Sequence, residues 1–238
     1  MRSEEIAWVH LFALNLPFDT TKPFFYWPFF SFELWMMFCM GWIIISTDML
    51  HVTLTHLVTM ELNNLGLIMG EIGWVDEDEE SEEKAIRELK KLSRIHQQLI
   101  EVTNELDTIT SLLLFVNAFS CLMILCVASF LAVTGEGHLF MVKYILPATA
   151  IAWQFFIQCH FGNAITDASL KVSEGVYNSA WYKASPKYRK LALLVMMRAQ
   201  KAQKLTGWKF IDINMETYFW IIQTAHTYYS FLKGIYNS

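Results

Sequence analysis

The chain has 238 residues, of which 54% are hydrophobic and only 17% charged, and its formal net charge at pH 7 is −5. Soluble domains are typically about 45–50% apolar and about 25% charged, so this composition indicates a membrane protein. The negative net charge gives no basis for broad attraction to nucleic acid or to anionic lipid.

The chain begins with a short apolar run, Ile6–Leu16, behind Arg2, Glu4 and Glu5. Its 11 residues are too few to cross a bilayer, which takes about 20. No small-residue cleavage site closes the run, so it does not have the pattern of a signal peptide. We interpret it as the outer end of a helix whose beginning is missing, and we expect the chain to be truncated.

The first complete span is predicted at about Phe29–Met49, after an entry rich in aromatic residues and proline at 23–30. Such an entry is typical of the membrane interface, and residues 1–28 are therefore expected to hold the end of a preceding span and a loop. Asp48 should face protein or water, because a carboxylate is costly in lipid. The same helix is expected to continue into the aqueous phase, which gives a transmembrane helix at 29–60.

The next segment, 61–108, is predicted to be an aqueous region. Residues 74–83 include seven acids, which is typical of a solvated loop, and they lack the glycine-punctuated pattern of a calcium loop. From Lys84 to Leu106, apolar residues recur every three or four positions, which predicts an amphipathic helix. Its apolar stripe consists of Ile86, Leu89, Leu92, Ile95, Leu99, Val102 and Leu106. We expect this stripe to pack against another cytoplasmic helix or another subunit.

Residues 109–162 are predicted to form a transmembrane helical hairpin. Ile109–Val133 contains 25 residues without a charge, and a second span runs from about Phe140 to Gly162. Its one charge, Lys143, lies near the start, where a lysine side chain can reach the interface. Only residues 134–139 separate the spans, so the two helices should be antiparallel.

Residues 163–214 are predicted to be a second aqueous region. A helix begins there after Ser185, with Pro186 in the first turn, where its missing N–H costs nothing. One face of this helix is expected to consist of Tyr188, Leu191, Leu194, Val195 and Arg198.

The last span is predicted within 215–238, where the helix starts at Met215 and is unusually polar from Gln223 to Ser230. An amphipathic surface helix would explain this polarity, and so would a helix that lines an aqueous pore.

The orientation of the spans follows from their flanking lysines and arginines. Regions 61–108 and 163–214 hold 14 of the 18 basic residues, and the positive-inside rule makes both cytoplasmic. The N-terminal segment, the hairpin turn and the C-terminus are then expected on the extracellular side.

The sequence shows no pattern that indicates catalysis or metal binding. His51 and His56 are five positions apart, not the three or four that place two ligands on one helical face. The cysteines show no CxxC pairing, and we find no phosphate-binding glycine loop, nucleophile elbow or paired acids. The four cysteines are Cys39, Cys121, Cys126 and Cys159. We predict that the chain is no enzyme and uses no metal or cofactor.

Several short motifs, taken in order, resemble the C-terminal part of the insect odorant receptor family. They are Phe161-Gly162-Asn163, Tyr177-Asn178-Ser179-Ala180-Trp181, Arg189-Lys190 and Thr227-Tyr228. Two positions depart from the family pattern: Gln200-Lys201-Ala202 replaces a Gln-Arg-Pro element, and His226 stands where a tyrosine is common. In the family the first motif marks a helix exit, which implies a structural hydrogen bond for His160 at a helix end.

The resemblance implies an all-α polytopic membrane helical bundle with an inverted seven-helix receptor topology. Helices 4–7 of that topology would be present here, and helices 1–3 mostly missing. It also implies a subunit of an odour-gated cation channel, multi-pass in the plasma membrane of olfactory sensory neurons. Its partners would be a small volatile odorant, the odorant receptor co-receptor in a heterotetramer, and membrane lipid, but no nucleic acid.

The resemblance further assigns candidate residues to a pore. Aligning Thr227-Tyr228 with the family's last helix places Tyr228, Phe231, Gly234 and Ile235 at or near the gate. A ring of apolar side chains such as Phe231 and Ile235 gates by excluding water. The alternative is that these residues only pack or fray at a terminus.

The implied odorant pocket lies in the outer half of the membrane and is mostly aromatic and aliphatic. Our candidates for it are Trp35, Phe38 and Trp42, which share one helical face, and Tyr144. An aromatic stripe at this spacing is also typical of ordinary packing. Two other functions remain open, a truncated non-conducting receptor fragment and a small membrane scaffold without a pore.

Overall fold

The computed structural model describes residues 23–72, 79–134 and 138–236. The chain divides into two compact units, Met1–Leu50 and His51–Ser238, and each is considered by itself. The apolar run Ile6–Leu16 lies outside the described residues, as do residues 73–78 of the acidic segment and 135–137 of the hairpin turn.

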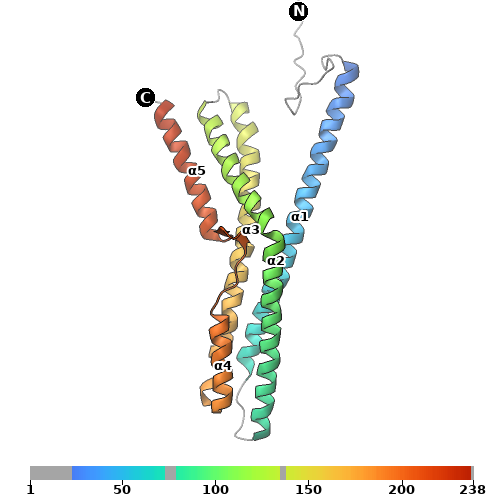
Figure 1. Ribbon diagram of the computed structural model, residues 1–238. Coiled ribbons are helices and arrows are strands. Elements are labelled where there is room, and N and C mark those ends of the chain that lie inside the picture. The colour runs from blue at the N-terminus through green and yellow to red at the C-terminus, as the bar shows by residue number, and fades with distance from the viewer. Residues whose placement is uncertain (1–22, 73–78, 135–137, 237–238) are drawn as a thin grey trace, which may run out of the picture. The chain divides into compact units, whose positions relative to one another are not determined.

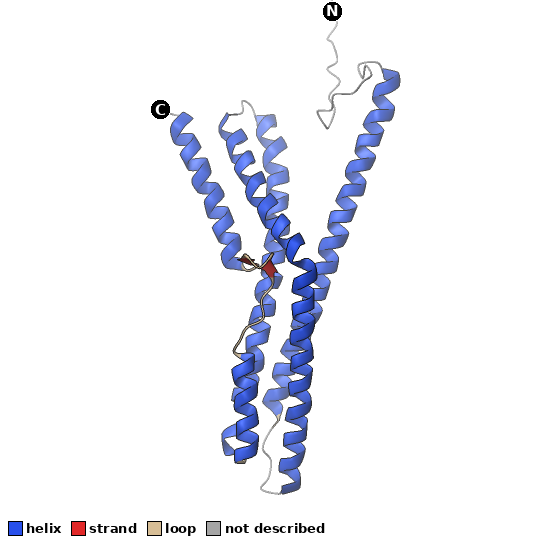
Figure 2. Cartoon of the chain, viewed as in Figure 1, coloured by secondary structure: helices blue, strands red, loops and turns tan. Residues whose placement is uncertain are grey.

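Nearly all of the described chain is helical, which confirms the predicted all-α class (Figure 2). Two short strands stand between the last two helices (Figure 1). In chain order the elements are α1 (Pro23–Glu71), α2 (Glu79–Thr134), α3 (His138–Asn178), the 3-10 helix η1 (Trp181–Lys183), α4 (Pro186–Ala199), β1 (Thr206–Gly207), β2 (Ile211–Asp212) and α5 (Met215–Tyr236).

Among the described helices, α1 and α2 are long and apolar enough by themselves to cross a membrane. Only 6% and 17% of their most apolar windows are buried inside the protein. The core helix of a soluble protein would be mostly buried, so these exposed apolar surfaces favour a lipid environment. With 56 residues, α2 is about 84 Å long at 1.5 Å per residue, far more than the roughly 30 Å of hydrocarbon. It therefore joins the predicted cytoplasmic helix and the following span in one unbroken helix, which changes direction about midway (Figure 1).

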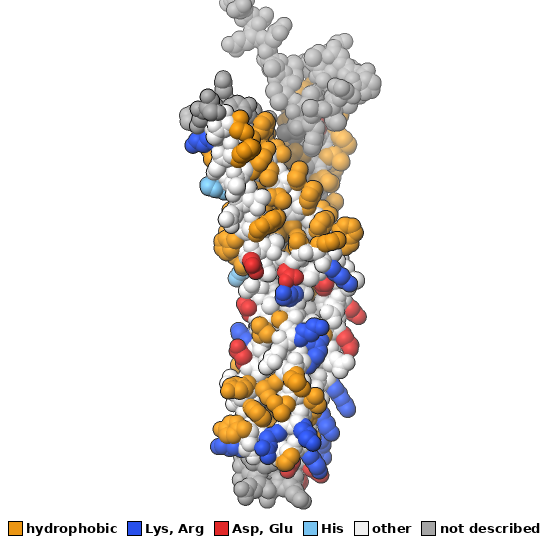
Figure 3. Space-filling model, turned by 60° about the vertical axis from the view of Figure 1, so that its left-hand side comes forward, with side chains coloured by type: hydrophobic (Ala, Val, Ile, Leu, Met, Phe, Trp, Pro, Cys, Tyr) orange, Lys and Arg blue, Asp and Glu red, His pale blue; other side chains and the backbone are white. Residues whose placement is uncertain are grey.

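The core of the second unit runs along its helices, with the part of α1 that belongs to this unit packed among them. At the end that holds α4, the core includes Leu62 and Met69 of α1, Leu89 and Leu92 of α2, Val172 and Val176 of α3, and Tyr188, Ala192 and Val195 of α4. Charged side chains of both signs gather on this half, whereas hydrophobic side chains cover much of the half that holds α5 (Figure 3). The distribution is that expected when one half lies in water and the other in lipid.

The amphipathic part of α2 is helical as predicted, but its buried face is displaced from the predicted stripe. Ile95 and Val102 are exposed, whereas His96, Ile100 and Thr103 are buried. Thr103 fits this apolar surface because its hydroxyl donates to the carbonyl of Leu99 at 2.7 Å. Hydrophobicity alone did not identify a face that carries a histidine and a threonine.

Helix α4 starts as the sequence predicts, with Pro186 in its first turn and Ser185 as its N-cap. The Ser185 hydroxyl accepts the Tyr188 N–H at 3.3 Å, which satisfies one of the free donors of the first turn. Of the predicted face, Tyr188 and Val195 are buried, but Leu194 is 60% exposed. Ala192, Met196 and Ala199 complete the buried face.

A short β-hairpin, residues 206–212, connects α4 to α5 and is fastened to α2. Its strands pair Thr206 with Asp212 and Gly207 with Ile211. The Asp107 carboxylate accepts the Thr206 N–H at 2.6 Å and the Thr206 hydroxyl at 3.0 and 3.1 Å. The Trp208 N–H donates to the carbonyl of Ser111 at 3.0 Å. These bonds fix the start of α5 against the middle of α2.

The turn of this hairpin is strained, which leads to a stability prediction at Lys209. Its φ of 59° lies in the left-handed region, which costs a residue with a Cβ about 1 kcal/mol or more. Lys209→Gly should therefore be more stable than Lys209→Ala by about 1 kcal/mol. Both variants remove the same exposed side chain, so thermal unfolding in detergent isolates the backbone effect. Equal melting temperatures would show that the turn carries no strain at this residue.

Candidate functional site

Helix α5 has two distinct faces. Ile221 and Ala225 are buried against the rest of the unit, and α5 packs chiefly on α2 and α3. Another face carries an open groove of about 560 Å³. Its lining residues are Trp220, Gln223, Thr224, Thr227, Tyr228 and Phe231.

The structure places the four predicted gate residues on the exposed side of α5. Phe231 is 64% exposed, Ile235 56% and Tyr228 38%. Nothing lies within 4 Å of the position that a Cβ on Gly234 would take. Within the described part of the chain, an aqueous path or another subunit could therefore reach this side of α5.

The polar groups on the groove face differ in what they require from their surroundings. The Thr224 hydroxyl donates to the carbonyl of Trp220 at 2.8 Å, and the Thr227 hydroxyl to that of Gln223 at 2.9 Å. Both threonines thus satisfy themselves within the helix and tolerate lipid. The carboxamide of Gln223 is exposed and too large to be satisfied in this way. Placing this carboxamide in hydrocarbon without a hydrogen-bond partner would cost several kcal/mol. Gln223 therefore requires water or a polar partner.

The three aromatic candidates of α1 lie in a row in the first unit. The ring centroids of Trp35 and Phe38 lie 6.2 Å apart, and those of Phe38 and Trp42 lie 6.3 Å apart. Each side chain is more than 60% exposed. The helical spacing thus brings these three together, as the sequence indicates.

Tyr144, the fourth candidate, lies in the second unit and lines an apolar pocket of about 230 Å³ between α2 and α3. Pro147 stands one turn further along α3 and also lines it. The pocket wall on α2 consists of Met123, Ile124, Val127, Ala128 and Leu131. Such a wall suits a small apolar ligand.

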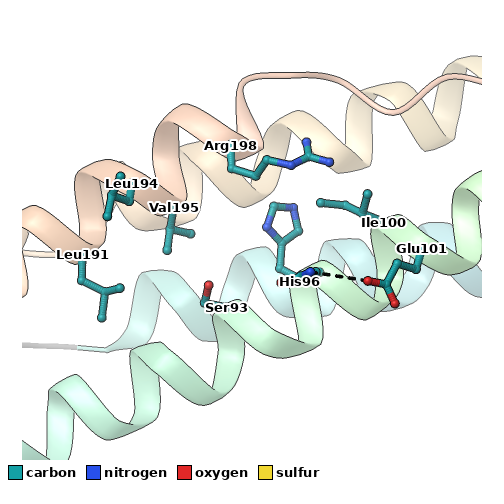
Figure 4. Close-up of a pocket in the computed structure, with 9 residues that line it drawn as sticks. Ser93, His96, Ile100, Glu101, Leu191, Leu194, Val195 and Arg198 are labelled. Atoms are coloured by element: carbon teal, nitrogen blue, oxygen red, sulfur yellow. Dashed lines mark hydrogen bonds between the residues drawn. The ribbon is translucent and has the colours of Figure 1, made fainter.

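A further groove lies between α2 and α4. It involves residues 93–101 of α2 and 191–198 of α4, not α5, and the sequence did not predict it. It has a volume of about 550 Å³, and Arg198 of α4 extends toward the imidazole of His96 on α2 (Figure 4). The Gln97 amide donates to the Glu101 carboxylate at 3.4 Å along one edge. In the sequence, the one indication of this groove is that His96 falls on the buried face of α2.

The environment of His96 predicts a pH dependence of stability. Burial lowers the pKa of His96 below its ordinary 6.5, and the Arg198 guanidinium lowers it further. The unfolded chain then binds the proton more readily, so the free energy of unfolding should fall as the pH drops from 6.5 toward the lowered folded-state pKa. In His96→Gln this pH-dependent fall in the free energy of unfolding should be absent. Melting curves recorded between about pH 5 and pH 8 provide the measurement. His160→Gln, at an exposed histidine, should retain it, and equal behaviour of the two variants would contradict the assignment.

The predicted helix end near His160 is wrong. Helix α3 continues without interruption to Asn178. Gly162 is used for close packing, since a Cβ there would lie 2.1 Å from the carbonyl oxygen of Ile213. Asn163 does not cap a terminus, because its amide donates to the Asp167 carboxylate one turn later at 2.9 Å. His160 is exposed and stacks on Phe156 with centroids 6.1 Å apart.

The two histidines considered as a metal pair are placed differently in α1. His51 is buried and His56 is exposed, with its ring at 5.9 Å from that of Phe161. Within the residues that the structure describes, no three His, Cys, Asp or Glu side chains are grouped to hold a metal ion.

Comparison with known proteins identifies a single family. The family model described as 7tm Odorant receptor matches residues 3–226. Odorant receptor 45a of Drosophila melanogaster is 28% identical over 221 residues, covering 92% of this chain and 56% of the relative. Odorant receptor 67c of the same species is 24% identical over 229 residues, covering 95% of this chain and 55% of the relative. The chain thus spans about half the length of these curated relatives.

The fold is similar to that of a solved receptor. The insect olfactory receptor OR5 from Machilis hrabei, in complex with eugenol, matches with a TM-score of 0.79 and 18% identity. The match covers 93% of this chain and 56% of that receptor. A second structure of OR5 from Machilis hrabei gives a TM-score of 0.78 at 19% identity. Together with the two apolar helices, this confirms the predicted helical membrane bundle.

Proposed function

Because the chain belongs to the 7tm odorant receptor family, whose members are receptors and not enzymes, we propose that it acts as an odorant-gated cation channel subunit. The subunit would bind a small volatile odorant and assemble with the odorant receptor co-receptor in a heterotetramer. Its place would be the plasma membrane of olfactory sensory neurons. The observation that carries the channel proposal is the exposed Gln223 on the groove face of α5.

The physical argument concerns the depth of Gln223 in the membrane. It lies eight residues into α5, about 12 Å from the first residue of the helix at 1.5 Å per residue. If α5 crosses the bilayer, this amide is well inside the hydrocarbon layer. A carboxamide at that depth is stable only where water or protein satisfies it. A water-filled pore along the groove face meets this requirement.

In this arrangement Phe231 and Ile235 stand beyond the polar part of the same face and form the gate. A ring of such side chains, one set from each subunit, would close a pore by excluding water. Gly234 between them leaves space, and Tyr228 would mark the inner edge of the constriction. Odorant binding would open the pore only to the extent that the ligand binds the open state more tightly than the closed one.

For the ligand we propose two contact surfaces: the aromatic row Trp35, Phe38 and Trp42, and the pocket at Tyr144. OR5 from Machilis hrabei was solved with eugenol, a small aromatic molecule. A ligand of this class fits an apolar pocket of about 230 Å³, in which shape and dispersion provide the affinity.

The proposal predicts different effects for two adjacent substitutions on α5. Gln223→Leu should reduce odour-evoked current to less than half in cells that express this chain with the co-receptor, because it removes the polar lining. Thr224→Val should have little effect, since that hydroxyl is already bonded to the Trp220 carbonyl. Phe231→Ala should raise the current in the absence of odour, because it removes part of the apolar gate.

Surface biotinylation supplies the control for expression of each variant. One outcome is that this chain and the co-receptor both reach the surface while no odour in a broad panel evokes current. In that case the channel proposal fails, and a non-conducting fragment or a scaffold is favoured. If Gln223→Leu and Thr224→Val behave alike, the groove face of α5 does not line the pore.

A further inference from the structure

The turn of the β-hairpin has an unusual composition for its geometry. Trp208 and Lys209 have φ values of 47° and 59°, and the Phe210 N–H donates to the Gly207 carbonyl at 3.0 Å. Two successive residues with positive φ stand in this three-residue loop, and such positions favour Gly, Asn or Asp. A tryptophan and a lysine are costly there. Strain of this kind persists where the surrounding structure enforces it, and it is a reason to look for a function.

The side chains at this turn are held in place, yet much of their surface remains exposed. We call Trp208, Lys209 and Phe210 the hairpin tip. Trp208 is 57% exposed and Phe210 78% exposed, with their ring centroids 5.9 Å apart. On its other side the Trp208 ring meets Phe115 of α2 edge to face at 5.5 Å. The tip therefore presents two aromatic rings and one ammonium group on a rigid support.

The position of the tip along α2 indicates what it meets. The Trp208 N–H is bonded to Ser111, two residues after the start of the uncharged run at Ile109. The tip thus lies at the level where α2 passes from its charged half to its apolar half (Figure 1). Tryptophan with a neighbouring lysine is the combination that proteins place at the membrane–water interface.

We propose that the hairpin tip binds the lipid headgroup layer of the leaflet adjacent to α4. Trp208 and Phe210 would lie among the glycerol and upper acyl groups, and the Lys209 ammonium would contact lipid phosphate. The proposal depends on the chain being a membrane protein and does not depend on odour-gated conduction. Contact with a second subunit is less favoured, because three side chains provide little of the roughly 1,000 Å² that a stable interface buries and lysine is depleted in interface cores.

The test uses the full chain in nanodiscs of phosphatidylcholine and phosphatidylserine, labelled with 5-fluorotryptophan. The ¹⁹F line of Trp208 is the one lost in Trp208→Phe. Lipid with a headgroup spin label should remove most of the Trp208 signal, whereas a water-soluble paramagnetic chelate should have a weaker effect. Trp181 in η1, at the far end of α3, should be insensitive to the labelled lipid. Trp153 on α3 should respond instead to lipid labelled in its acyl chain.

Two other outcomes would overturn the proposal. If only the aqueous chelate broadens the Trp208 line, the tip projects into water. If neither agent affects it while Trp153 responds, another protein surface covers the tip, which would favour a subunit contact.

A second measurement examines the charge at the tip. Lys209→Glu places a carboxylate against the lipid phosphates and should weaken the effect of headgroup-labelled lipid on Trp208. Lys201→Glu changes the charge at an exposed lysine outside the hairpin and should leave that effect unchanged. Lys209→Gly removes the ammonium group but suits the left-handed backbone of the turn. It therefore shows the effect of losing the charge while the hairpin stays folded. Equal spectra for Lys209→Glu and Lys201→Glu would show that Lys209 makes no headgroup contact.

Discussion

Gly175→Ala is expected to destabilise the second unit by about 3 kcal/mol or more, because it inserts a methyl group into a backbone contact. A Cβ at this position would lie 2.0 Å from the carbonyl oxygen of Gly66 and 2.8 Å from its carbonyl carbon. Backbone atoms cannot rotate away as a flexible side chain does. The C-terminal ends of α1 and α3 would have to separate, and the core residues Met69 and Val172 beside them would lose contacts.

The matched control for this substitution is Gly41→Ala, also inside a long helix. Nothing lies within 4 Å of the Cβ position at Gly41. Alanine there should leave stability unchanged or raise it by up to about 1 kcal/mol through helix propensity. Melting temperatures of both variants in one detergent provide the comparison. Similar values for the two would mean that α1 and α3 do not approach as closely at Gly66 and Gly175 as the structure shows.

Asp107→Ala is expected to have the second largest effect, about 3 kcal/mol, because it removes an acceptor that no other group replaces. The carboxylate accepts the N–H and the hydroxyl of Thr206 and thereby ties the hairpin to α2. Without it, the partly buried Thr206 N–H loses a charge-assisted hydrogen bond. Hydrogen exchange at the Thr206 amide should accelerate more than exchange in the middle of α4.

Asp212→Ala is the control on the same hairpin. Asp212 pairs with Lys204 at 2.6 Å, but the two side chains are 39% and 51% exposed. An exposed pair contributes at most about 1 kcal/mol, so this variant should remain close to the parent. Asp107→Asn, which retains one acceptor oxygen, should fall between the two. The role of Asp107 would be disproved by a melting temperature for Asp107→Ala equal to that of Asp212→Ala.

Features determined by nearby residues could be predicted from the sequence. Pro186 after Ser185 predicts the start of α4, and α5 begins at Met215, where the side chain of Asn214 accepts the Thr217 N–H at 2.9 Å. The helical spacing of Trp35, Phe38 and Trp42 likewise predicts one aromatic face. Each of these rests on capping or periodicity within a few residues.

Features imposed by distant residues could not be predicted in this way. The turn at Trp208 and Lys209 contains no residue that favours left-handed backbone. Hydrogen bonds that the hairpin donates to Asp107 and Ser111 enforce it. Gly162 gave the appearance of a helix end because its packing against Ile213 is a tertiary contact. For the site, the sequence suggested the exposed face of α5 through a family resemblance, but not the groove at His96, which exists only where α4 folds back along α2.

The unbroken length of α2 has a mechanical consequence. Its 56 residues include neither proline nor glycine, the residues at which helices most often bend, whereas α1 and α3 contain Pro28 and Pro147. The helix is unbroken from end to end, although it changes direction about midway (Figure 1). A displacement of one half is therefore passed to the other half through a continuous helix. The hairpin that precedes α5 is bonded to the middle of α2. Helix α2 therefore either holds the start of α5 in place or passes its own movement on to α5. The substitution Val116→Pro would distinguish these two roles.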